Sequence, residues 1–410
     1  MAARAWLGRH VRAVAACLAL LLGLLLVVAV SWHFSSFALA PDMSPYSDRV
    51  DIEAIGQGRI TMARSEASER PGYYGLTWQA GHAIVGPIEE EDAETVTRRL
   101  NHVRGYLVPG TEAGLETNVY AGNPRQGRGL PYRAVDVPTA LGPMPAWLIP
   151  PAPRPAPAAR PSNTWAIVVH GHTDNRQNGL RIAPTLRQAG LTALLISYRK
   201  DLGAPDSPDG LYHLGETEWE DLEAAARYAV SHGARRLLLV GYSMGGALVA
   251  QLMQHSPLRD RVSGVVLDAP ALDWKSIFAF NSEQMGLPGF FSLPVEWTID
   301  ARIDPDWGSL DALRHADAFQ PPVLLFHGTE DTVVPIDDSD EFAEELGERV
   351  TYYRVPKADH TQEWNVDPAL YERRLSRFIL QIDTKEATSA PSRRPETHRA
   401  RPAGSGSNAR

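Results

Sequence analysis

Residues 237–246 read Leu-Leu-Leu-Val-Gly-Tyr-Ser-Met-Gly-Gly, and they are the most informative stretch of the chain. The apolar start predicts a buried strand, and residues 247–255 are compatible with a helix. A serine at a tight strand-to-helix turn has strained backbone angles and projects its hydroxyl outward, while the glycines two positions away let strand and helix approach closely. The competing interpretation is a glycine-rich turn with a solvated serine. The setting favours Ser243 as a nucleophile.

Similar apolar runs occur on both sides of this turn. They are too continuous for half-exposed strands, and they alternate with amphipathic helical segments. The runs cover residues 165–170, 192–197, 237–240, 264–267, 323–326 and 350–355. Buried parallel strands have this pattern. The chain therefore predicts a doubly wound, mostly parallel α/β sheet.

Further elements are predicted around these strands. Residues 132–138 and 144–150 predict two more strands, and the proline-rich stretch 150–161 predicts an extended loop. The sequence Thr-Glu-Trp-Glu at 217–220 fits a capping box before a helix over 221–231.

A nucleophilic serine needs a base that is itself oriented by an acid. Asp331 lies in a loop after one predicted strand, and His360 follows the last predicted strand. We expect His360 to accept the Ser243 proton and Asp331 to hold the imidazole. The order Ser243, Asp331, His360 is that of α/β-hydrolases, and differs from the orders in chymotrypsin-like and subtilisin-like enzymes.

Three other carboxylates compete with Asp331. Glu330 is its neighbour, but adjacent residues project differently. Asp359 precedes His360 and can hardly reach around its own backbone to orient that ring. Asp268 is the strongest rival, because an acid at the end of a neighbouring strand could also reach the histidine.

The turn His170-Gly171-His172-Thr173 follows the predicted strand 165–170. Such a turn supplies a backbone N–H to an oxyanion hole, so we expect the N–H groups of His172 and Met244 to act together. The alternative is that His170 and His172 form an H-x-H metal pair. No further carboxylate or thiolate is placed at suitable spacing around them, so we expect no metal site.

Together, residues 241–246, the His170-Gly171 turn, the Asp331 loop and His360 resemble the α/β-hydrolase superfamily. Within it, Gly-Tyr-Ser-Met-Gly-Gly and the late Asp-His-Thr are similar to the serine hydrolases of the prolyl-oligopeptidase-like and BEM46-like branch. The resemblance covers roughly residues 128–382 and implies a serine hydrolase without a cofactor. It leaves the substrate open, because the superfamily includes esterases, lipases, thioesterases, peptidases and acyltransferases.

Residues 273–318 lie between two predicted core strands. The segment contains seven large aromatic residues: Trp274, Phe278, Phe280, Phe290, Phe291, Trp297 and Trp307. We interpret it as a short cap that gives the nucleophile an apolar acyl-binding wall. The alternative is ordinary helix packing.

Residues 13–30 form an unbroken apolar run that would span roughly 27 Å as a helix, close to the thickness of the bilayer core. Arginines precede the run and aspartates follow it, so the positive-inside rule places the N-terminus in the cytoplasm and the rest outside. This predicts a single-pass signal anchor. The alternative is a signal peptide cleaved after Ala-Leu-Ala at 38–40, but the run is long for one and Pro41 follows the site.

The overall composition restricts the class of function. The chain has 410 residues and a formal net charge of -9, which excludes a basic nucleic-acid binder. None of its lysines lies in a P-loop motif, which excludes a P-loop nucleotide mechanism. The single cysteine, Cys17, lies in the N-terminal apolar run and provides neither a disulfide nor a thiolate zinc cluster.

The expected organisation has five parts: a cytoplasmic basic segment 1–12, a transmembrane anchor 13–34, an accessory β-rich region 35–127, a hydrolase domain 128–382, and a disordered tail 383–410. The leading hypothesis is a membrane-anchored extracytoplasmic serine hydrolase that cleaves small-molecule carboxylic esters through an acyl-enzyme. The alternatives are a serine peptidase or acyltransferase with the same three residues, and a non-catalytic binding module of the same fold.

Overall fold

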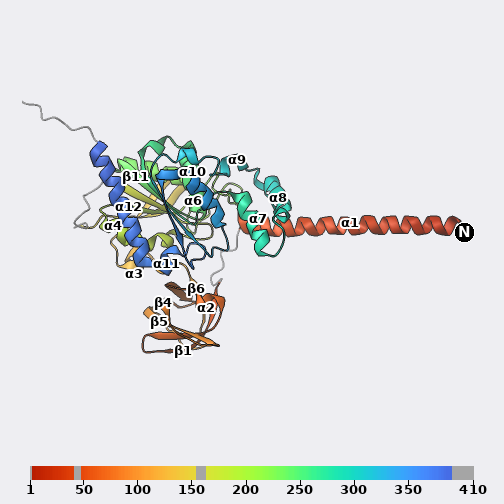
Figure 1. Ribbon diagram of the computed structural model, residues 1–410, viewed down its shortest axis with the longest axis horizontal. Helices are drawn as coiled ribbons and strands as arrows, with labels where there is room; N and C mark the ends of the chain where they lie inside the picture. The colour runs from red at the N-terminus through yellow and green to blue at the C-terminus, as the bar shows by residue number, and fades with distance from the viewer. Residues whose placement is uncertain (1, 41–47, 154–162, 390–410) are drawn as a thin grey trace, which may run out of the picture.

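The computed structural model describes residues 2–40, 48–153 and 163–389 (Figure 1). Within these ranges the chain forms a long N-terminal helix, a small β-barrel and an α/β domain. Most of the predicted proline-rich loop and residues 390–410 of the predicted tail lie outside the described residues. The last helix, α12 (Pro368–Ser389), continues beyond residue 383, where the sequence predicted that the tail begins.

The α/β domain is built on one eight-stranded sheet in the order β14-β13-β12-β11-β9-β10-β8-β7. Its strands are β7 (Arg133–Thr139), β8 (Gly142–Ile149), β9 (Thr164–Val169), β10 (Thr192–Ile196), β11 (Arg236–Tyr242), β12 (Val262–Asp268), β13 (Val323–Gly328) and β14 (Val350–Val355). The six strands from β9 to β14 pair in parallel, and β7 and β8 add an antiparallel edge. The predicted doubly wound, mostly parallel sheet is confirmed.

Helices cover both faces of this sheet. Successive side chains of a strand point to opposite faces, so each strand contributes residues to two buried clusters. Ile167 and Val169 of β9 belong to one buried cluster, and Ala166 and Val168 belong to the other. The first cluster includes residues of α5 (Trp219–Ser231), α6 (Met244–His255) and α10 (Ile336–Leu346). The second includes residues of α4 (Ala183–Gln188) and α12. This explains the continuous apolar runs in the sequence.

The predicted capping box at the start of α5 does not form. The helix begins at Trp219, and its N-cap residue, Glu218, makes no side-chain capping bond. Instead, the buried Glu218 carboxylate accepts hydrogen bonds from the backbone N–H groups of His213 and Gly215. The hydroxyl of Thr217 is buried without a hydrogen-bond partner in the described structure. Glu218 therefore holds the loop that precedes α5, and the predicted capping box is absent.

The N-terminal lobe is a closed six-stranded barrel in the order β1-β2-β5-β4-β3-β6. Its strands are β1 (Arg49–Gly56), β2 (Arg59–Ala63), β3 (Tyr74–Trp78), β4 (Gly81–Glu91), β5 (Thr95–Arg104) and β6 (Glu112–Glu116). The lobe is hydrogen-bonded to the α/β domain: the Tyr74 hydroxyl lies 2.7 Å from Oε1 of Gln362, and the Asn365 side chain donates to the carbonyls of Tyr73 and Thr117.

The first helix, α1 (Ala2–Leu39), projects from the α/β domain as a single rod (Figure 1). Its segment Val14–Leu39 is long and apolar enough to cross a membrane, and most of it is exposed. Its last turns pack against the rest of the chain, where Ser31, Ser35, Ala38 and Leu39 are buried. Exposed apolar surface of this extent marks an interaction site.

An insertion between β12 and β13 contains α7 (Trp274–Gln284), η3 (Gly289–Ser292), α8 (Leu293–Ile303), α9 (Trp307–Leu310) and η4 (Ala316–Ala318). Helix α8 packs beside the end of α1 (Figure 1). Nη1 of Arg302 lies 2.9 Å from the hydroxyls of both Ser35 and Ser36, and its guanidinium carbon lies 4.5 Å from the ring centre of Trp32. The end of α1 and the insertion are therefore packed against each other.

Candidate active site

Ser243 lies between the end of β11 and the first residue of α6. Its φ of 50° and ψ of -120° are strained for a residue with a side chain. Its N–H donates to the carbonyl of Asp268 at 2.9 Å, and its carbonyl accepts from Gly246 at 2.8 Å and Ala271 at 3.0 Å. These bonds hold the strained turn and fix the serine at the carboxyl edge of the sheet.

Glycines make this turn possible. A β-carbon on Gly241 would lie 2.5 Å from the Gly245 carbonyl oxygen, and one on Gly245 would lie 2.5 Å from the Val169 carbonyl oxygen. A β-carbon on Gly171 would lie 2.9 Å from Cβ of Ser243. The loop after β9, the predicted oxyanion loop, therefore passes directly beside the serine.

The structure brings together Ser243, His360 and Asp331. Nε2 of His360 lies 2.8 Å from Oγ of Ser243, and Nδ1 of His360 lies 2.8 Å from Oδ2 of Asp331. The carboxylate can only accept, so Nδ1 carries a proton and the neutral ring leaves Nε2 free to accept from the serine. Burial alone would lower the pKa of His360, but the neighbouring Asp331 charge raises it above its ordinary value.

Asp331 is buried and held by several donors. Its Oδ1 accepts from the N–H groups of Val333 and Val334, both at 2.8 Å. Its Oδ2 also lies 3.2 Å from Nε2 of the buried His327. Burial alone would raise the pKa of Asp331, but the two imidazoles lower it well below the usual range. His327 was not among the residues predicted from the sequence, although it stands four residues before Asp331.

The competing acids have other partners. Glu330 is exposed. One oxygen of Asp359 accepts from the N–H and the hydroxyl of Thr332, both at 2.9 Å, so it braces the loop. Asp268 is buried and accepts from the Tyr371 hydroxyl at 2.7 Å. Of the four candidate carboxylates, the geometry favours Asp331 as the partner of the imidazole.

The peptide between Gly171 and His172 has a defined orientation. The Gly171 carbonyl accepts from the Tyr198 hydroxyl at 2.8 Å and from Nδ1 of His170 at 2.9 Å. The C=O and N–H of a trans peptide point in opposite directions, so the His172 N–H is directed away from Tyr198. Met244 begins α6, and its N–H is one of the amides that a helix leaves unpaired at its N-terminus.

The ring nitrogens of His170 and His172 contact different partners and do not face a common ligand site. Both nitrogens of the buried His170 face acceptors, the Gly171 carbonyl and the Asp201 carboxylate at 2.7 Å, so the ring is protonated. Burial alone would lower its pKa, but Asp201 raises it. Nε2 of His172 donates to the carbonyl of Ala38 at 2.8 Å, and burial lowers its pKa to about 4. Within the described ranges, no group of three or more His, Cys, Asp or Glu residues is arranged to hold a metal ion.

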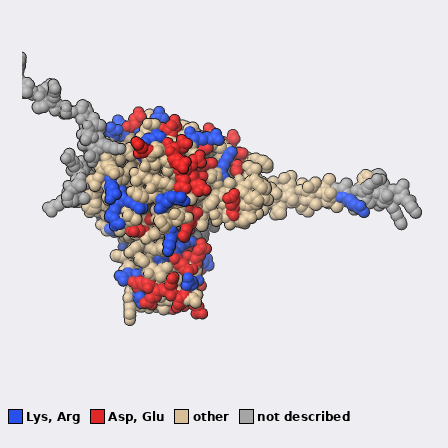
Figure 2. All heavy atoms as spheres, in the orientation of Figure 1, with Lys and Arg blue, Asp and Glu red and all other residues tan. Residues whose placement is uncertain are grey.

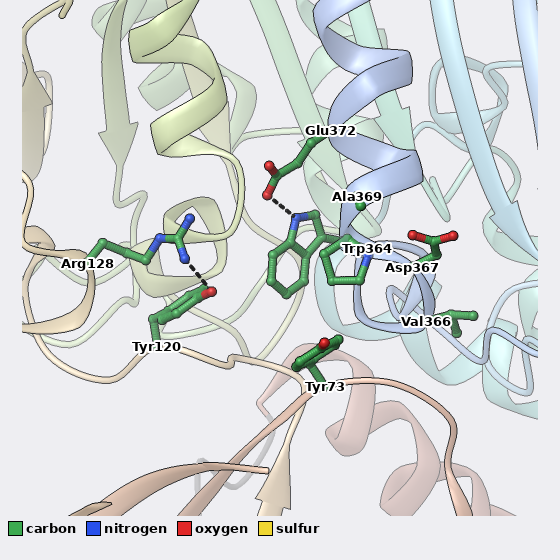
Figure 3. Close-up of a pocket in the computed structure, with 9 residues that line it drawn as sticks. Tyr73, Tyr120, Arg128, Trp364, Val366, Asp367, Ala369 and Glu372 are labelled. Atoms are coloured by element: carbon green, nitrogen blue, oxygen red, sulfur yellow. Dashed lines mark hydrogen bonds between the residues drawn. The ribbon is translucent and has the colours of Figure 1, made fainter. Parts of the chain in front are cut away.

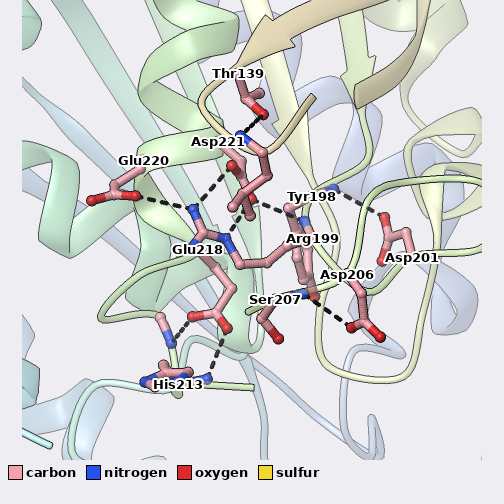
Figure 4. A network of polar contacts seen from close by, with 12 residues as sticks. Thr139, Tyr198, Arg199, Asp201, Asp206, Ser207, His213, Glu218, Glu220 and Asp221 are labelled. Carbon is pink, nitrogen blue, oxygen red and sulfur yellow. Dashed lines mark hydrogen bonds and ion pairs between the residues drawn. The ribbon is translucent and has the colours of Figure 1, made fainter. Parts of the chain in front are cut away.

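The loop after β10 carries a network of polar contacts (Figure 4). Nε of the buried Arg199 lies 2.8 Å from Oδ2 of Asp221, and its Nη2 lies 3.1 Å from Oε2 of Glu220. Asp201 binds the Tyr198 N–H in addition to His170. The network ties this loop to α5 and so supports the peptide beside Ser243.

The insertion contacts the acid loop: the Asn281 side chain donates to the carbonyl of Val333 at 2.9 Å. Its aromatic residues fall into two groups. Trp274 is buried, and Phe278 and Trp307 pack against the core. Phe290, Phe291 and Trp297 are 66%, 48% and 67% exposed, respectively. Ordinary helix packing does not account for the exposed group.

A separate hollow of about 300 Å³ lies between the lobe and the α/β domain (Figure 3). Tyr73, Tyr120 and Trp364 form its aromatic wall, Arg128 is hydrogen-bonded to the Tyr120 hydroxyl, and Nε1 of Trp364 donates to Glu372 at 3.1 Å. Neither Ser243 nor His360 nor Asp331 lines this hollow.

Two family models match parts of the chain. A model described as "Prolyl oligopeptidase family" matches residues 208–382, which include Ser243, Asp331 and His360. A second, described as "Domain of unknown function (DUF8805)", matches residues 51–116 in the barrel.

Similar proteins cover about two thirds of the chain. Uncharacterized protein YfhR of Salmonella typhimurium is 28% identical over 283 residues, which cover 64% of this chain and 85% of that protein. YfhR of Escherichia coli O157:H7 is 23% identical, covering 67% and 89%. Among solved structures, Pyrococcus furiosus esterase PF2001 has a TM-score of 0.50 and 19% identity, covering 64% of this chain and 95% of that chain. The last similarity concerns the fold.

Proposed function

Because the chain is a serine hydrolase with the α/β-hydrolase fold, we propose that Ser243, His360 and Asp331 are its catalytic residues and that it cleaves carboxylic esters. The observation that carries the proposal is the continuous contact from the Ser243 hydroxyl through His360 to the buried Asp331 carboxylate, with both distances 2.8 Å. A neutral imidazole in this position can accept the serine proton as the hydroxyl attacks.

In the first half-reaction, Ser243 Oγ forms a bond to the ester carbonyl carbon, and its proton moves to Nε2 of His360. The tetrahedral intermediate collapses as the C–O bond to the alcohol breaks, and His360 returns the proton to the departing alkoxide. In the second, a water gives its proton to Nε2 and attacks the acyl-enzyme, which releases the carboxylic acid and restores Ser243. Asp331 keeps its negative charge throughout and stabilises the imidazolium.

The backbone N–H groups of His172 and Met244 would stabilise the oxyanion of the intermediate. The orientation of the Gly171–His172 peptide supports this role, since its carbonyl is already bound on the opposite side by Tyr198. The protonated His170 holds the same carbonyl and is itself fixed by Asp201. These two residues would position the donor without touching the substrate.

A serine peptidase is the second candidate, because the match over residues 208–382 is to the prolyl oligopeptidase family. Amide cleavage requires protonation of the leaving nitrogen and usually a site that grips the peptide on both sides of the bond. Large peptidases of that family gain such a grip from a propeller of many blades. The lobe here is one six-stranded barrel, which favours the ester assignment. An acyltransferase would use the same residues with a different acceptor.

We further propose that α1 anchors the enzyme in a membrane with the catalytic domain on the extracytoplasmic side. The exposed apolar segment Val14–Leu39 and the arginines before it support this topology. Cleavage after residue 40 would remove Ala38 and Leu39, which are buried in the folded domain. Their burial supports retention of the helix in the mature protein.

The test uses full-length protein in detergent with a fluorophosphonate probe and a panel of graded esters and short peptides. Wild type should be labelled at Ser243 and should hydrolyse esters much faster than peptides. Ser243→Ala should not be labelled, and His360→Ala should be labelled far more slowly. Equal labelling of Ser243→Ala would refute the assignment, and peptide cleavage as fast as the best ester would favour the peptidase.

Asp331→Asn and Asp268→Asn form a matched pair that tests the acid. The first should lose roughly a thousandfold in rate at normal folded yield, because the asparagine cannot stabilise the imidazolium. The second should mainly lower folded yield, because it disturbs the buried contact with Tyr371. The opposite pattern would transfer the acid role to Asp268.

A further inference from the structure

The insertion exposes an uncharged apolar surface. Residues 284–295, Gln-Met-Gly-Leu-Pro-Gly-Phe-Phe-Ser-Leu-Pro-Val, contain no charged side chain. The exposed large apolar residues of this segment and of the start of α8, which together we call the cap patch, are Met285, Leu287, Phe290, Phe291, Leu293 and Trp297. Each is more than 40% exposed, and the rings of Phe290 and Phe291 stack on each other 4.9 Å apart. A contiguous patch of this kind marks an interaction site.

The position of the cap patch relative to α1 indicates its partner. Burial of α1 begins at Ser31, so the 17 residues from Val14 to Val30 remain free, and they would span about 26 Å of hydrocarbon. From Trp32 onward the helix packs against α8, which carries Trp297. Helix α8 therefore lies at the level where α1 would leave the bilayer.

Exposed aromatic residues lie where α1 would leave the bilayer. Trp32 and Phe37 of α1 are 55% and 71% exposed, next to the helix that carries the 67% exposed Trp297. Tryptophan is enriched at membrane–water interfaces, where its ring lies among the lipid headgroups. Figure 2 shows the uncharged surface of α1 continuing onto the adjoining part of the α/β domain.

We propose that the cap patch inserts into the outer interface of the membrane that holds α1, so that the enzyme takes amphiphilic esters directly from the bilayer. The inference rests on the proposed function, both the anchor and the serine chemistry. The partner is the lipid surface, because an anchored α1 brings the patch to that surface without further binding. A loop without charges can enter the interface without desolvating an ion.

The end of α1 and the insertion each contact a loop that lies beside Ser243. The end of α1 holds the oxyanion loop through the bond from His172 to the Ala38 carbonyl. Helix α7 of the insertion holds the acid loop through the bond from Asn281 to the Val333 carbonyl. An ester whose acyl chain stays in the bilayer would meet the serine where these elements enter the interface. Long-chain acylglycerols and phospholipids have this chemistry.

Immersion can be measured with spin labels on the full chain, one copy per lipid nanodisc. In a Cys17→Ser background, a nitroxide is attached to Phe290→Cys or Trp297→Cys, and to Tyr106→Cys on the lobe as a control that is 79% exposed. Oxygen concentrates in lipid, whereas a nickel chelate stays in water. The labels at 290 and 297 should collide several times more often with oxygen than with nickel, and the control label should show the reverse.

Labels at 290 and 297 that behave like the control would overturn the proposal. Labels shielded from both reagents would also overturn it, because another part of the protein would then cover the patch. The depth measurement needs no ester. If the wild type hydrolysed no ester, the proposed function would be refuted, but the spin labels would still show whether the cap patch enters the membrane.

A kinetic comparison tests the substrate source. The rate on a long-chain ester in vesicles is divided by the rate on a short soluble ester for wild type, the double variant Phe290→Asp/Phe291→Asp, and the control Tyr106→Asp. Two charges in the patch should lower this ratio about tenfold, and the control should leave it unchanged. Fluorophosphonate labelling in detergent shows whether the double variant is folded. An unchanged ratio in a folded double variant would refute uptake from the bilayer.

Discussion

Nε2 of His327 lies 3.2 Å from Oδ2 of Asp331, and Nδ1 of His360 lies 2.8 Å from the same carboxylate oxygen. Nε2 of His327 also faces the Val334 carbonyl at 3.2 Å, so Nε2 carries a proton, and Nδ1 lies 2.7 Å from the Ser339 hydroxyl. His327 therefore donates to the acid and holds it in place. It acts through Asp331 and is a positioning residue.

The first prediction follows from this contact. His327→Leu should lower kcat for a soluble ester about tenfold and change KM less than twofold, because a hydrogen bond to a charged group contributes roughly 1.5–3 kcal/mol. Ser339→Ala, which removes only the partner of Nδ1, should lower kcat by a smaller factor. Steady-state kinetics decide the matter, and a rise in KM at constant kcat would show that His327 has another role.

The second prediction concerns pH. His360 accepts a proton only when neutral, and Asp331 raises its pKa above the ordinary value near 6.5. The value of kcat/KM should therefore rise with pH and level off above an apparent pKa higher than 6.5. In Asp331→Asn the charge is absent, so this apparent pKa should move down while the plateau falls. A wild-type profile that is already flat at pH 6 would contradict the assignment.

The third prediction uses the close approach of two backbones. Gly171→Ala would place a methyl group 2.9 Å from Cβ of Ser243, which forces the oxyanion loop away from the serine. A displacement of this size should lower kcat/KM about a hundredfold. Gly56→Ala is the matched control, because its added methyl group meets nothing within 4 Å. Thermal unfolding should show both variants folded. Equal activities would mean that this loop does not form the oxyanion hole.

The fourth prediction concerns acid stability. Burial lowers the pKa of His172 to about 4 in the folded protein, whereas the unfolded chain has a value near 6.5. Between these values the unfolded state binds more protons, so this contribution to the free energy of unfolding is full above pH 6.5 and is lost as the pH falls to about 4.

The matched variants for this prediction are His172→Phe and His232→Phe. The first should flatten the decline in melting temperature between pH 6.5 and 4, and should cost about 1 kcal/mol at pH 7 through the lost bond to Ala38. The second changes an exposed ring and should decline as wild type does. Parallel declines in all three proteins would show that His172 does not cause the acid sensitivity.

The sequence predicted the central sheet well, because buried parallel strands leave continuous apolar runs such as residues 237–240. It also predicted which serine, acid and histidine would meet, since the chain order of these residues follows from the topology of the sheet. It could not supply contacts that depend on tertiary packing. Nothing local to His170 indicates that Asp201, 31 residues later, would keep its ring protonated.

The same limitation applies to the ends of elements and to exposed surfaces. Thr217 and Glu220 satisfied the pattern of a capping box, yet the fold uses Glu218 to brace the preceding loop instead. The aromatic content of residues 273–318 was visible, but which rings are exposed depends on how the helices pack. Phe290 and Phe291, which were predicted to belong to an apolar acyl-binding wall, are 66% and 48% exposed.

The closure of the N-terminal barrel restricts what the lobe can bind. Each of its six strands has two hydrogen-bonded neighbours, because β1 pairs with both β2 and β6. A peptide cannot join this sheet as an added strand, and two lobes cannot fuse edge to edge. This prevents one route to aggregation. Any partner of the lobe must therefore recognise its side chains.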